Sequence, residues 1–226
     1  MHIIEVGNNE QNAVSYEGLV TLEQQVQQAI QAGQPIILQA RQQGRFFCAG
    51  FDLAELEPLE RGLVAAHFCR FLHLLRTLFL APVPVFCWAQ GHAVGVGAAL
   101  CLVADQAVMA PKAKFRFPEA HLGLGQFADI IALLHYRLAT PAQAEVIALQ
   151  SQAITALQAQ QWGLVHDLQH HSTQVHTAFQ HYLEHYWSPA YAEVKALCRE
   201  AQFRYSLAEQ TERFMHHWAA FIARQR

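Results

Sequence analysis

The stretch PVPVFCWAQGHAVGVGAALCLV, residues 82–103, indicates the fold class of the whole chain. Residues 83–88 form an apolar run that is typical of a buried strand in a parallel sheet. Three glycines between residues 91 and 97 separate this run from another apolar segment at 98–103. Glycine after a strand lets backbone N–H groups point outward with no side chain in the way. We therefore expect a loop here whose backbone N–H groups another group can approach closely.

Strands and helices alternate on both sides of this stretch. Short apolar or alternating runs predict further strands at 3–6, 36–38, 46–48, 107–110, 113–117 and 164–168. Helical spacing, with Ser15 and Thr140 as N-caps, predicts helices at 15–33, 63–80, 130–138, from 140, at 155–161 and from 173, with a break at Ser188–Pro189. This order indicates an α/β core at 1–170 and a C-terminal all-helical, oligomerisation region at 171–226.

The composition limits the classes of partner. Hydrophobic residues make up 53%, enough for a sizeable core, whereas the 15% of charged residues suggests either oligomer interfaces or an apolar surface. The formal net charge of −3, with no basic block, argues against nucleic acid and anionic membranes as partners. No apolar run reaches the ~18 residues needed to span a bilayer, and we expect no membrane association.

Cysteine and histidine usage indicates neither disulfides nor metal. The five cysteines are scattered without a CxxC pair, and the N-terminus resembles no signal peptide, so we expect reduced thiols and a cytoplasmic location. Most of the fourteen histidines lie in the C-terminal half. His181 and His185 share a helix face but lack an HExxH arrangement, so a polar helix face is favoured over a metal site and no metal is expected.

A second glycine loop lies in FCAGFDL, residues 47–53. Gly50 follows one predicted strand, just as Gly95 and Gly97 follow another. Ligands bind in the loops beyond the strand ends of parallel sheets. Two such loops could direct two N–H groups at one oxygen and form an oxyanion hole, in which each donor contributes roughly 3 kcal/mol. The alternative is tight packing of loop and helix against the sheet.

Several motifs in this order resemble the crotonase, or enoyl-CoA hydratase/isomerase, superfamily. They are FCAGFDL, residues 82–125 from PVPVFCWAQ to PEAHLGLG, QNAVS at 11–15, and AQAEVIALQSQAITALQAQQWGLV at 142–165. The resemblance covers about residues 8–168. It implies a spiral of ββα turns with a C-terminal helical region, assembled as a homotrimer or a dimer of trimers.

The resemblance also implies an acyl-CoA thioester substrate and no cofactor beyond the coenzyme A of that substrate. By motif position, the backbone N–H groups of Phe51 and Val96 would hold the thioester carbonyl. The family usually has glycine at the position of Val96. Valine keeps the N–H, but its side chain is expected to narrow the acyl pocket or tilt the amide.

The remaining binding residues are also assigned by the resemblance. Backbone groups near Gln11, Ala13 and Phe51 would line the nucleotide, and no lysine or arginine is indicated as a phosphate partner. The full set expected to bind substrate is Cys48, Gly50, Gly95, Gly97, Gln11, Ala13 and Asp129. Asp129 is included because some family members carry an acid about two residues earlier, at the position where this chain has Phe127. His92 and His121 are expected to be structural, and Asp52 and Asp105 to fix loops.

The carboxylates favour one reaction. Hydratases of the family carry two glutamates, and at the matching positions this chain has Ala99 and Glu119. A single base suffices to move a double bond, because it takes a proton at one carbon and returns it at another. Phe117, Pro118 and Leu122 should raise the pKa of Glu119. The other interpretation of Glu119 is an exposed loop carboxylate.

The predicted function is therefore an enoyl-CoA isomerase with Glu119 as proton shuttle and an enolate held by two amides. Two alternatives stay open. One is hydration or decarboxylation of a thioester carried by coenzyme A or by a carrier protein. The other is a non-catalytic homologue that binds thioesters, which Ala99 and Val96 favour.

Overall fold

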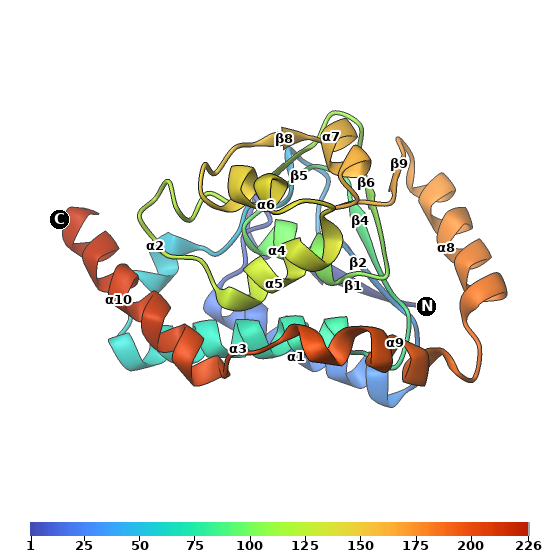
Figure 1. The fold of residues 1–226 in the computed structure, drawn as a ribbon, viewed down its shortest axis with the longest axis horizontal. Helices are drawn as coiled ribbons and strands as arrows, with labels where there is room; N and C mark the ends of the chain where they lie inside the picture. Colours follow the sequence, from blue (N-terminus) through green and yellow to red (C-terminus); the bar gives the residue numbers. More distant parts are fainter. Residues whose placement is uncertain (226) are drawn as a thin grey trace.

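The computed structural model describes residues 1–225, and its strands form two sheets (Figure 1). The strands are β1 (His2–Val6), β2 (Ile36–Ala40), β3 (Phe46–Cys48), β4 (Val85–Ala89), β5 (His92–Val94), β6 (Gln106–Met109), β7 (Lys114–Arg116), β8 (Ile154–Thr155) and β9 (Asp167–Leu168). The larger sheet has the order β1-β2-β4-β6-β9 and is parallel throughout, and the smaller has the order β3-β5-β7-β8. The predicted α/β class is confirmed.

Ten α-helices surround the sheets within the described residues. They are α1 (Tyr16–Gln31), α2 (Leu53–Leu56), α3 (Arg61–Phe79), α4 (Val96–Val103), α5 (Ala128–Arg137), α6 (Pro141–Ala148), α7 (Ala156–Gln161), α8 (Ser172–Tyr186), α9 (Tyr191–Arg199) and α10 (Leu207–Gln225). Ser15 caps α1, and Thr140 forms a capping box with Pro141 at the first turn of α6, as the sequence predicts.

The core repeats one unit three times: a strand in the larger sheet, a strand in the smaller sheet, then a helix. The units are β2–β3 with α2 and α3, β4–β5 with α4, and β6–β7 with α5. This is the ββα spiral that the resemblance implies. Because each β3, β5 or β7 strand precedes a helix, the strand-to-helix loops gather at one end of the smaller sheet.

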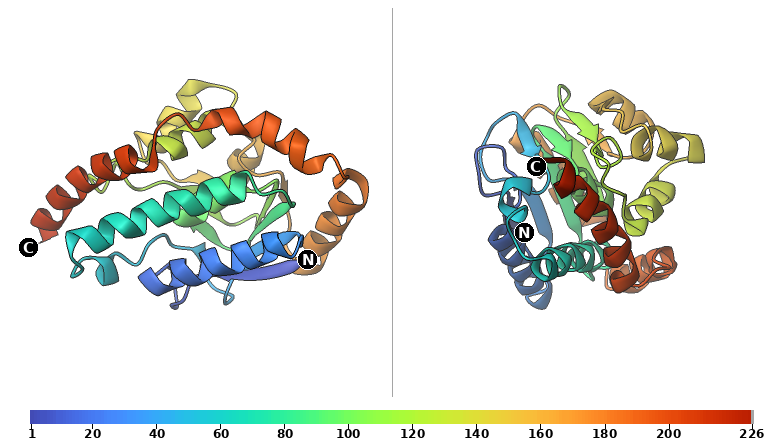
Figure 2. Two further views of the ribbon diagram at one scale, coloured as in Figure 1. Left: turned by 90° about the horizontal axis from the view of Figure 1, so that it is seen from below. Right: turned by 90° about the vertical axis from the view of Figure 1, so that its left-hand side faces the viewer.

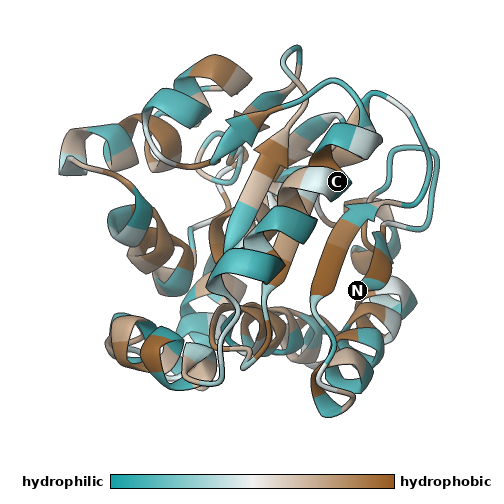
Figure 3. Cartoon of the chain, turned by 90° about the vertical axis from the view of Figure 1, so that its right-hand side faces the viewer, coloured by the Kyte–Doolittle hydropathy of each residue, from teal (hydrophilic) through white to brown (hydrophobic). Residues whose placement is uncertain are grey.

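The C-terminal helices take three different places. α8 lies over the larger sheet (Figure 3). It packs there through Val175 and Phe179, and the Phe179 and Phe86 rings stack at 4.4 Å. α9 follows the predicted break at Ser188–Pro189. α10 lies along α3, as the two views of Figure 2 show. No helix among residues 1–225 combines the length and apolar character that a membrane crossing requires.

Four sequence predictions need correction. The strand predicted at 83–88 begins at Val85, because Pro84 has no N–H to donate. The strand predicted at 164–168 is only Asp167–Leu168. The loop predicted at 91–97 contains β5, which pairs with β3 and β7. The expected helix after residue 173 is also interrupted a second time, between α9 and α10.

Candidate active site

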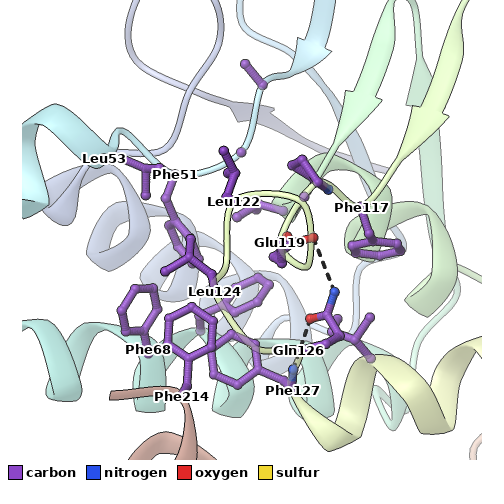
Figure 4. A pocket seen from close by; sticks show the side chains of 17 residues that line it. Phe51, Leu53, Phe68, Phe117, Glu119, Leu122, Leu124, Gln126, Phe127 and Phe214 are labelled. Carbon is purple, nitrogen blue, oxygen red and sulfur yellow. Dashed lines mark hydrogen bonds between the residues drawn. The ribbon is translucent and has the colours of Figure 1, made fainter. Parts of the chain in front are cut away.

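Two glycine loops and one carboxylate meet in a pocket at the end of the smaller sheet (Figure 4). One loop follows β3 and contains Gly50 and Phe51, and the other follows β5 and contains Gly95 and Val96. A Cβ atom on Gly95 would stand 3.6 Å from the Gly50 Cα and 3.2 Å from Glu119 Oε1. The two loops and the carboxylate are therefore in van der Waals reach of one another, and a side chain at position 95 would fill the space between them.

The N–H of Phe51 is directed by a short parallel bridge to Val14. The Val14 N–H donates to the Gly50 carbonyl, and the Asp52 N–H donates to the Val14 carbonyl. Successive N–H groups of an extended chain point to opposite sides. The Phe51 N–H therefore points away from Val14, and no acceptor for it is found in residues 1–225.

The second free N–H belongs to Val96, the first residue of α4. The first N–H groups of a helix have no partner within the helix, and the helix dipole makes this end favourable to negative charge. No acceptor for the Val96 N–H is found in the described part of the chain either. Gly95 has the unusual backbone angles, with φ 53° and ψ −109°, whereas Val96 is helical. Valine at position 96 is thus conformationally acceptable, because the strained position is the preceding glycine.

Glu119 lies on a turn after β7, which the Leu124 N–H and Leu122 N–H close by donating to the carbonyls of Glu119 and Pro118. Its side chain is half-buried and lines the pocket, so it is not an exposed loop carboxylate. Burial raises the pKa of Glu119 to about 7, against the opposing effects of its hydrogen bonds and of Arg116. The predicted upward shift is confirmed, and the carboxylate can act as a base near neutral pH.

Gln126 is a pocket residue that the sequence reasoning missed. The Phe127 N–H donates to Gln126 Oε1 at 3.0 Å, which fixes the orientation of the amide. Gln126 Nε2 therefore faces Glu119 and donates to Oε2 at 3.2 Å (Figure 4). One carboxylate oxygen is thereby occupied, whereas Oε1 is the oxygen next to Gly95. A lone glutamine in a loop carries no sequence signal for this role.

The rest of the pocket is apolar. Among the described residues that line it, six are phenylalanines: Phe51, Phe68, Phe71, Phe117, Phe127 and Phe214. Glu119 is the one carboxylate in that set. Ala99 is fully buried within α4 and does not line the pocket. The site thus offers two amides, one base and an apolar surface, an arrangement that can stabilise negative charge on an oxygen and move a proton beside it.

The structure brings together only part of the predicted substrate-binding set. Gly50 and Gly95 line the pocket with Phe51, Val96 and Glu119. Cys48 and Gly97 lie behind it, where a Cβ on Gly97 would collide with the Cys48 carbonyl at 2.6 Å. Burial raises the pKa of the Cys48 thiol to about 12. These two residues support the loops by close packing and do not face the pocket.

Asp129 also lies outside this pocket, which corrects its predicted place. It accepts hydrogen bonds from Arg76 Nε at 2.7 Å and from Gln210 Nε2 at 2.9 Å, so it joins α5 to α3 and α10. Its side chain is 1% exposed. A carboxylate buried in this way is structural.

Gln11 and Ala13 belong to the loop that fixes the Phe51 segment. The Asn9 side chain accepts from the N–H groups of both residues and donates to Asp52. Gln11 is exposed and Ala13 is buried, and neither lines the pocket. Asp52 caps α2 by accepting from the Glu55 N–H, as expected of a loop-fixing acid. No group of histidine, cysteine or acidic side chains in residues 1–225 has a geometry suited to a metal ion.

Comparison with known proteins gives a consistent result. A family model described as enoyl-CoA hydratase/isomerase matches residues 3–220. The 1,2-epoxyphenylacetyl-CoA isomerase of Escherichia coli (strain K12) is 35% identical over 143 residues, which cover 61% of this chain and 53% of that protein. The 2,3-dehydroadipyl-CoA hydratase of the same organism is 36% identical over 124 residues, or 55% of this chain and 48% of the relative. The chain thus spans about half the length of these curated relatives.

Solved structures show the same fold. An enoyl-CoA hydratase/isomerase from Mycobacterium paratuberculosis superposes with a TM-score of 0.83 at 20% identity, covering 98% of this chain and 93% of that chain. An enoyl-CoA hydratase from Bacillus halodurans gives a TM-score of 0.79 at 20% identity, over 94% and 87% of the two chains. At this identity the likeness establishes the fold alone.

Proposed function

The chain belongs to the enoyl-CoA hydratase/isomerase family, and from this premise we propose that it moves a double bond in an acyl-CoA thioester. The observation that carries the proposal is the meeting of the two free N–H groups and one carboxylate in a single pocket. The reaction needs no cofactor beyond the coenzyme A of the substrate. The relatives include both an isomerase and a hydratase by name, so the choice between the reactions rests on the residues of the site.

In the proposed first step, the Glu119 carboxylate removes a proton from the α-carbon of a 3-enoyl thioester. The electron pair of the broken C–H bond forms a C1–C2 double bond, and the π electrons of the carbonyl move to its oxygen, which gives a dienolate. The N–H groups of Phe51 and Val96 stabilise this oxygen more strongly in the enolate than in the neutral thioester, which lowers the barrier. In the second step Glu119 returns the proton to the γ-carbon, where the C3–C4 π pair takes it. The carbonyl forms again, the C1–C2 pair moves to C2–C3, and the product is the 2-enoyl thioester.

The state of Glu119 suits both steps. A base with a pKa of about 7 is partly ionised at neutral pH and becomes an acid of useful strength once protonated. The hydrogen bond from Gln126 occupies Oε2, so Oε1 is the oxygen left for the substrate. One carboxylate oxygen can serve both the α-carbon and the γ-carbon, because a small rotation of the Glu119 side chain moves it from one to the other.

The test is Glu119→Gln, assayed with 3-enoyl-CoA by the ultraviolet absorbance of the conjugated 2-enoyl product. We expect at least a thousand-fold loss of kcat, since the amide cannot accept the proton, with thioester binding retained in calorimetry. Glu57→Gln, at an exposed position after α2, is the matched control and should keep full activity. Unchanged turnover in Glu119→Gln would overturn the mechanism.

Hydration is the second candidate, because one of the similar relatives is named a hydratase. Adding water benefits from a second group that orients the water, and Gln126 is the one other polar side chain among the described lining residues. Incubation with 2-enoyl-CoA and mass analysis separates the reactions: a product one water heavier supports hydration, and loss of carbon dioxide from a malonyl-type thioester supports decarboxylation. Thioester binding with no product from any substrate would indicate a non-catalytic homologue.

We also propose that the chain assembles as a homotrimer or a dimer of trimers. Large apolar side chains are exposed on and beside α9, with Val194 55%, Leu197 69% and Tyr186 61% accessible. Such a surface is stabilised when another copy covers it. Sedimentation equilibrium should give a mass of three or six chains, and a monomer would exclude this assembly.

A further inference from the structure

Ser151, in the segment between α6 and β8, has a backbone conformation that a residue with a side chain rarely adopts. Its φ is 51°, and it is one of two residues other than glycine with a positive φ in the described part of the chain. Only 2% of it is exposed. A strained residue of this kind persists where the surrounding structure holds it, and such residues cluster at functional sites. Its hydrogen bonds therefore show what the strain maintains.

Two hydrogen bonds join Ser151 to residues on either side of Glu119. The Ser151 hydroxyl accepts from the His121 N–H at 3.2 Å, and the Ser151 carbonyl accepts from Arg116 Nε at 2.9 Å. Arg116 is the last residue of β7, which pairs with β8 just after Ser151. The segment 116–121, with Glu119 inside it, is thus held at both ends by one buried residue.

Arg116 extends this link to the second glycine loop of the pocket. Its carbonyl accepts from the N–H of Gly95 at 2.9 Å, and Gly95 precedes Val96. A chain of hydrogen bonds therefore runs from Ser151 through Arg116 to the loop that carries one of the two free N–H groups. The base and this amide are held by the same framework.

The Glu119 side chain has little else to fix its position. Its one side-chain donor within the described residues is the amide of Gln126, at 3.2 Å. The remaining bonds of its turn are backbone bonds inside the same loop, which set the shape of the loop but not its place against the sheet. A displacement of about 1 Å can cost roughly a hundredfold in rate. The anchors at Ser151 thus bear directly on the geometry of the site.

From the strained backbone of Ser151 and its two hydrogen bonds, we infer that Ser151 is a positioning residue that holds Glu119 at a fixed distance from the N–H groups of Phe51 and Val96. Ser151 is not among the described residues that line the pocket, so it acts through the Glu119 loop. The inference rests on the proposed function, because a proton shuttle needs its base fixed against both amides. Glycine would adopt this φ without strain but would offer no hydroxyl to the His121 N–H.

Ser151→Gly and Ser151→Thr separate the hydroxyl from the strain. Glycine loses the hydroxyl and relieves the strain, whereas threonine keeps the hydroxyl and fits a positive φ poorly. With 3-enoyl-CoA we expect Ser151→Gly to lose roughly tenfold to a hundredfold in kcat, with KM within about twofold of the parent. Its urea midpoint should be unchanged or higher. Ser151→Thr should have a lower urea midpoint yet keep kcat within about threefold.

A second measurement does not depend on turnover. Burial raises the pKa of Glu119 to about 7, and a carboxylate released from this place meets more water. Carbon-13 NMR of the glutamate carboxyl groups follows the titration, and the signal of Glu119 is the one missing from Glu119→Gln. We expect its midpoint to fall in Ser151→Gly toward the ordinary value of 4.5 and to stay near 7 in Ser151→Thr.

Ser188→Gly, at an exposed position between α8 and α9, is the matched control and should change neither kcat nor the titration. Ser151→Ala is used if the threonine variant does not fold, because it loses the hydroxyl and keeps the strain. It should match Ser151→Gly in kcat and have a lower urea midpoint. A serine that is merely structural would instead make kcat follow stability and leave the Glu119 titration in place.

The outcomes separate this inference from the proposed function. Full kcat and an unmoved titration midpoint in Ser151→Gly overturn the positioning role and leave the proton shuttle standing. No turnover of 3-enoyl-CoA by the parent overturns the proposed function, whereas a lowered midpoint in Ser151→Gly would still support the hold of Ser151 on Glu119.

Discussion

Glu119 is half-buried and Asp105 is buried, and these two carboxylates are held in opposite ways. Asp105 accepts from Lys195 Nζ at 2.7 Å, from Arg199 Nη2 at 2.8 Å and from the Val85 N–H at 2.7 Å. Glu119 lies among phenylalanines, and its one side-chain hydrogen-bond donor within the described residues is the neutral amide of Gln126. Two cations pair with the first group, whereas no cation forms an ion pair with the second within the described residues.

The partners of Asp105 explain its place. Lys195 also donates to the Val83 carbonyl, and Arg199 to the Phe79 carbonyl at the end of α3. The ion pairs therefore fasten α9 to the core at the ends of β4 and α3. Asp105 was expected to fix a loop through the backbone, and its bond to the Val85 N–H confirms this. Hydrogen-bond and ion-pair partners, rather than burial alone, thus separate the structural carboxylate from the one that can act as a base.

The largest expected effect comes from removing the charge of Asp105. Asp105→Asn leaves Lys195 and Arg199 buried without a counter-charge, and breaking a buried pair in this way costs about 3–5 kcal/mol. Urea denaturation at neutral pH should show this loss in the free energy of unfolding. Glu193→Gln, at an exposed position of α9, should change it by less than about 0.5 kcal/mol. Equal free energies of unfolding for Asp105→Asn and Glu193→Gln would contradict the structural role of Asp105 and, with it, the contrast with Glu119.

The same exchange at Glu119 should have the opposite sign. Its pKa is about 7 in the fold and near 4.5 when unfolded, so its favourable contribution is complete below pH 4.5 and is lost as pH rises through 7. Glu119→Gln removes that loss of stability, because the amide does not ionise as pH rises. We expect the variant to be roughly 2 kcal/mol more stable than the parent at pH 8 and similar to it at pH 4. Denaturant titrations at both pH values measure this, and a destabilised variant at pH 8 would contradict the assigned environment.

A smaller effect is expected from Gln126, the hydrogen-bond partner of Glu119. Glu119 must be ionised to accept a proton, so kcat/KM should rise with pH through about 7 and level off above it. The Gln126 hydrogen bond lowers the pKa of Glu119, so Gln126→Leu should move this limb to higher pH with little change on the plateau. Gln161→Leu, at an exposed position of α7, is the control. If the rising part of the pH profile does not move in Gln126→Leu, Gln126 does not act through the pKa of Glu119.

The sequence predicts the chemistry-bearing loops well because their signals are local. Gly50, Gly95 and Glu119 each stand in a motif a few residues long, and the structure gathers them in one pocket. The ββα order also follows from local patterns of strand and helix. β5 was missed because three residues between glycines carry too short a pattern to read as a strand; its pairing with β3 and β7 depends on distant segments.

The residue roles that the sequence did not predict depend on partners far along the chain. Asp129 is structural because Arg76 and Gln210, on two other helices, bond to it. Phe214 has the same apolar spacing as any core residue of a helix, and nothing local marks it as a pocket residue. Gln126 acquires its role only when the turn after β7 brings Glu119 beside it.

The contact of α10 with the Glu119 loop has a consequence for the order of synthesis. Gly123 and Gly125 leave space that a Cβ would take from Arg224 and His217 of α10, at 2.6 and 2.7 Å, and α10 also carries Phe214. A nascent chain that has emerged only to Ser206 already contains Glu119, Phe51 and Val96 but lacks Phe214, which lines the pocket. A chain shortened at this point would therefore present an apolar surface to chaperones and proteases until residues 207–225 cover it.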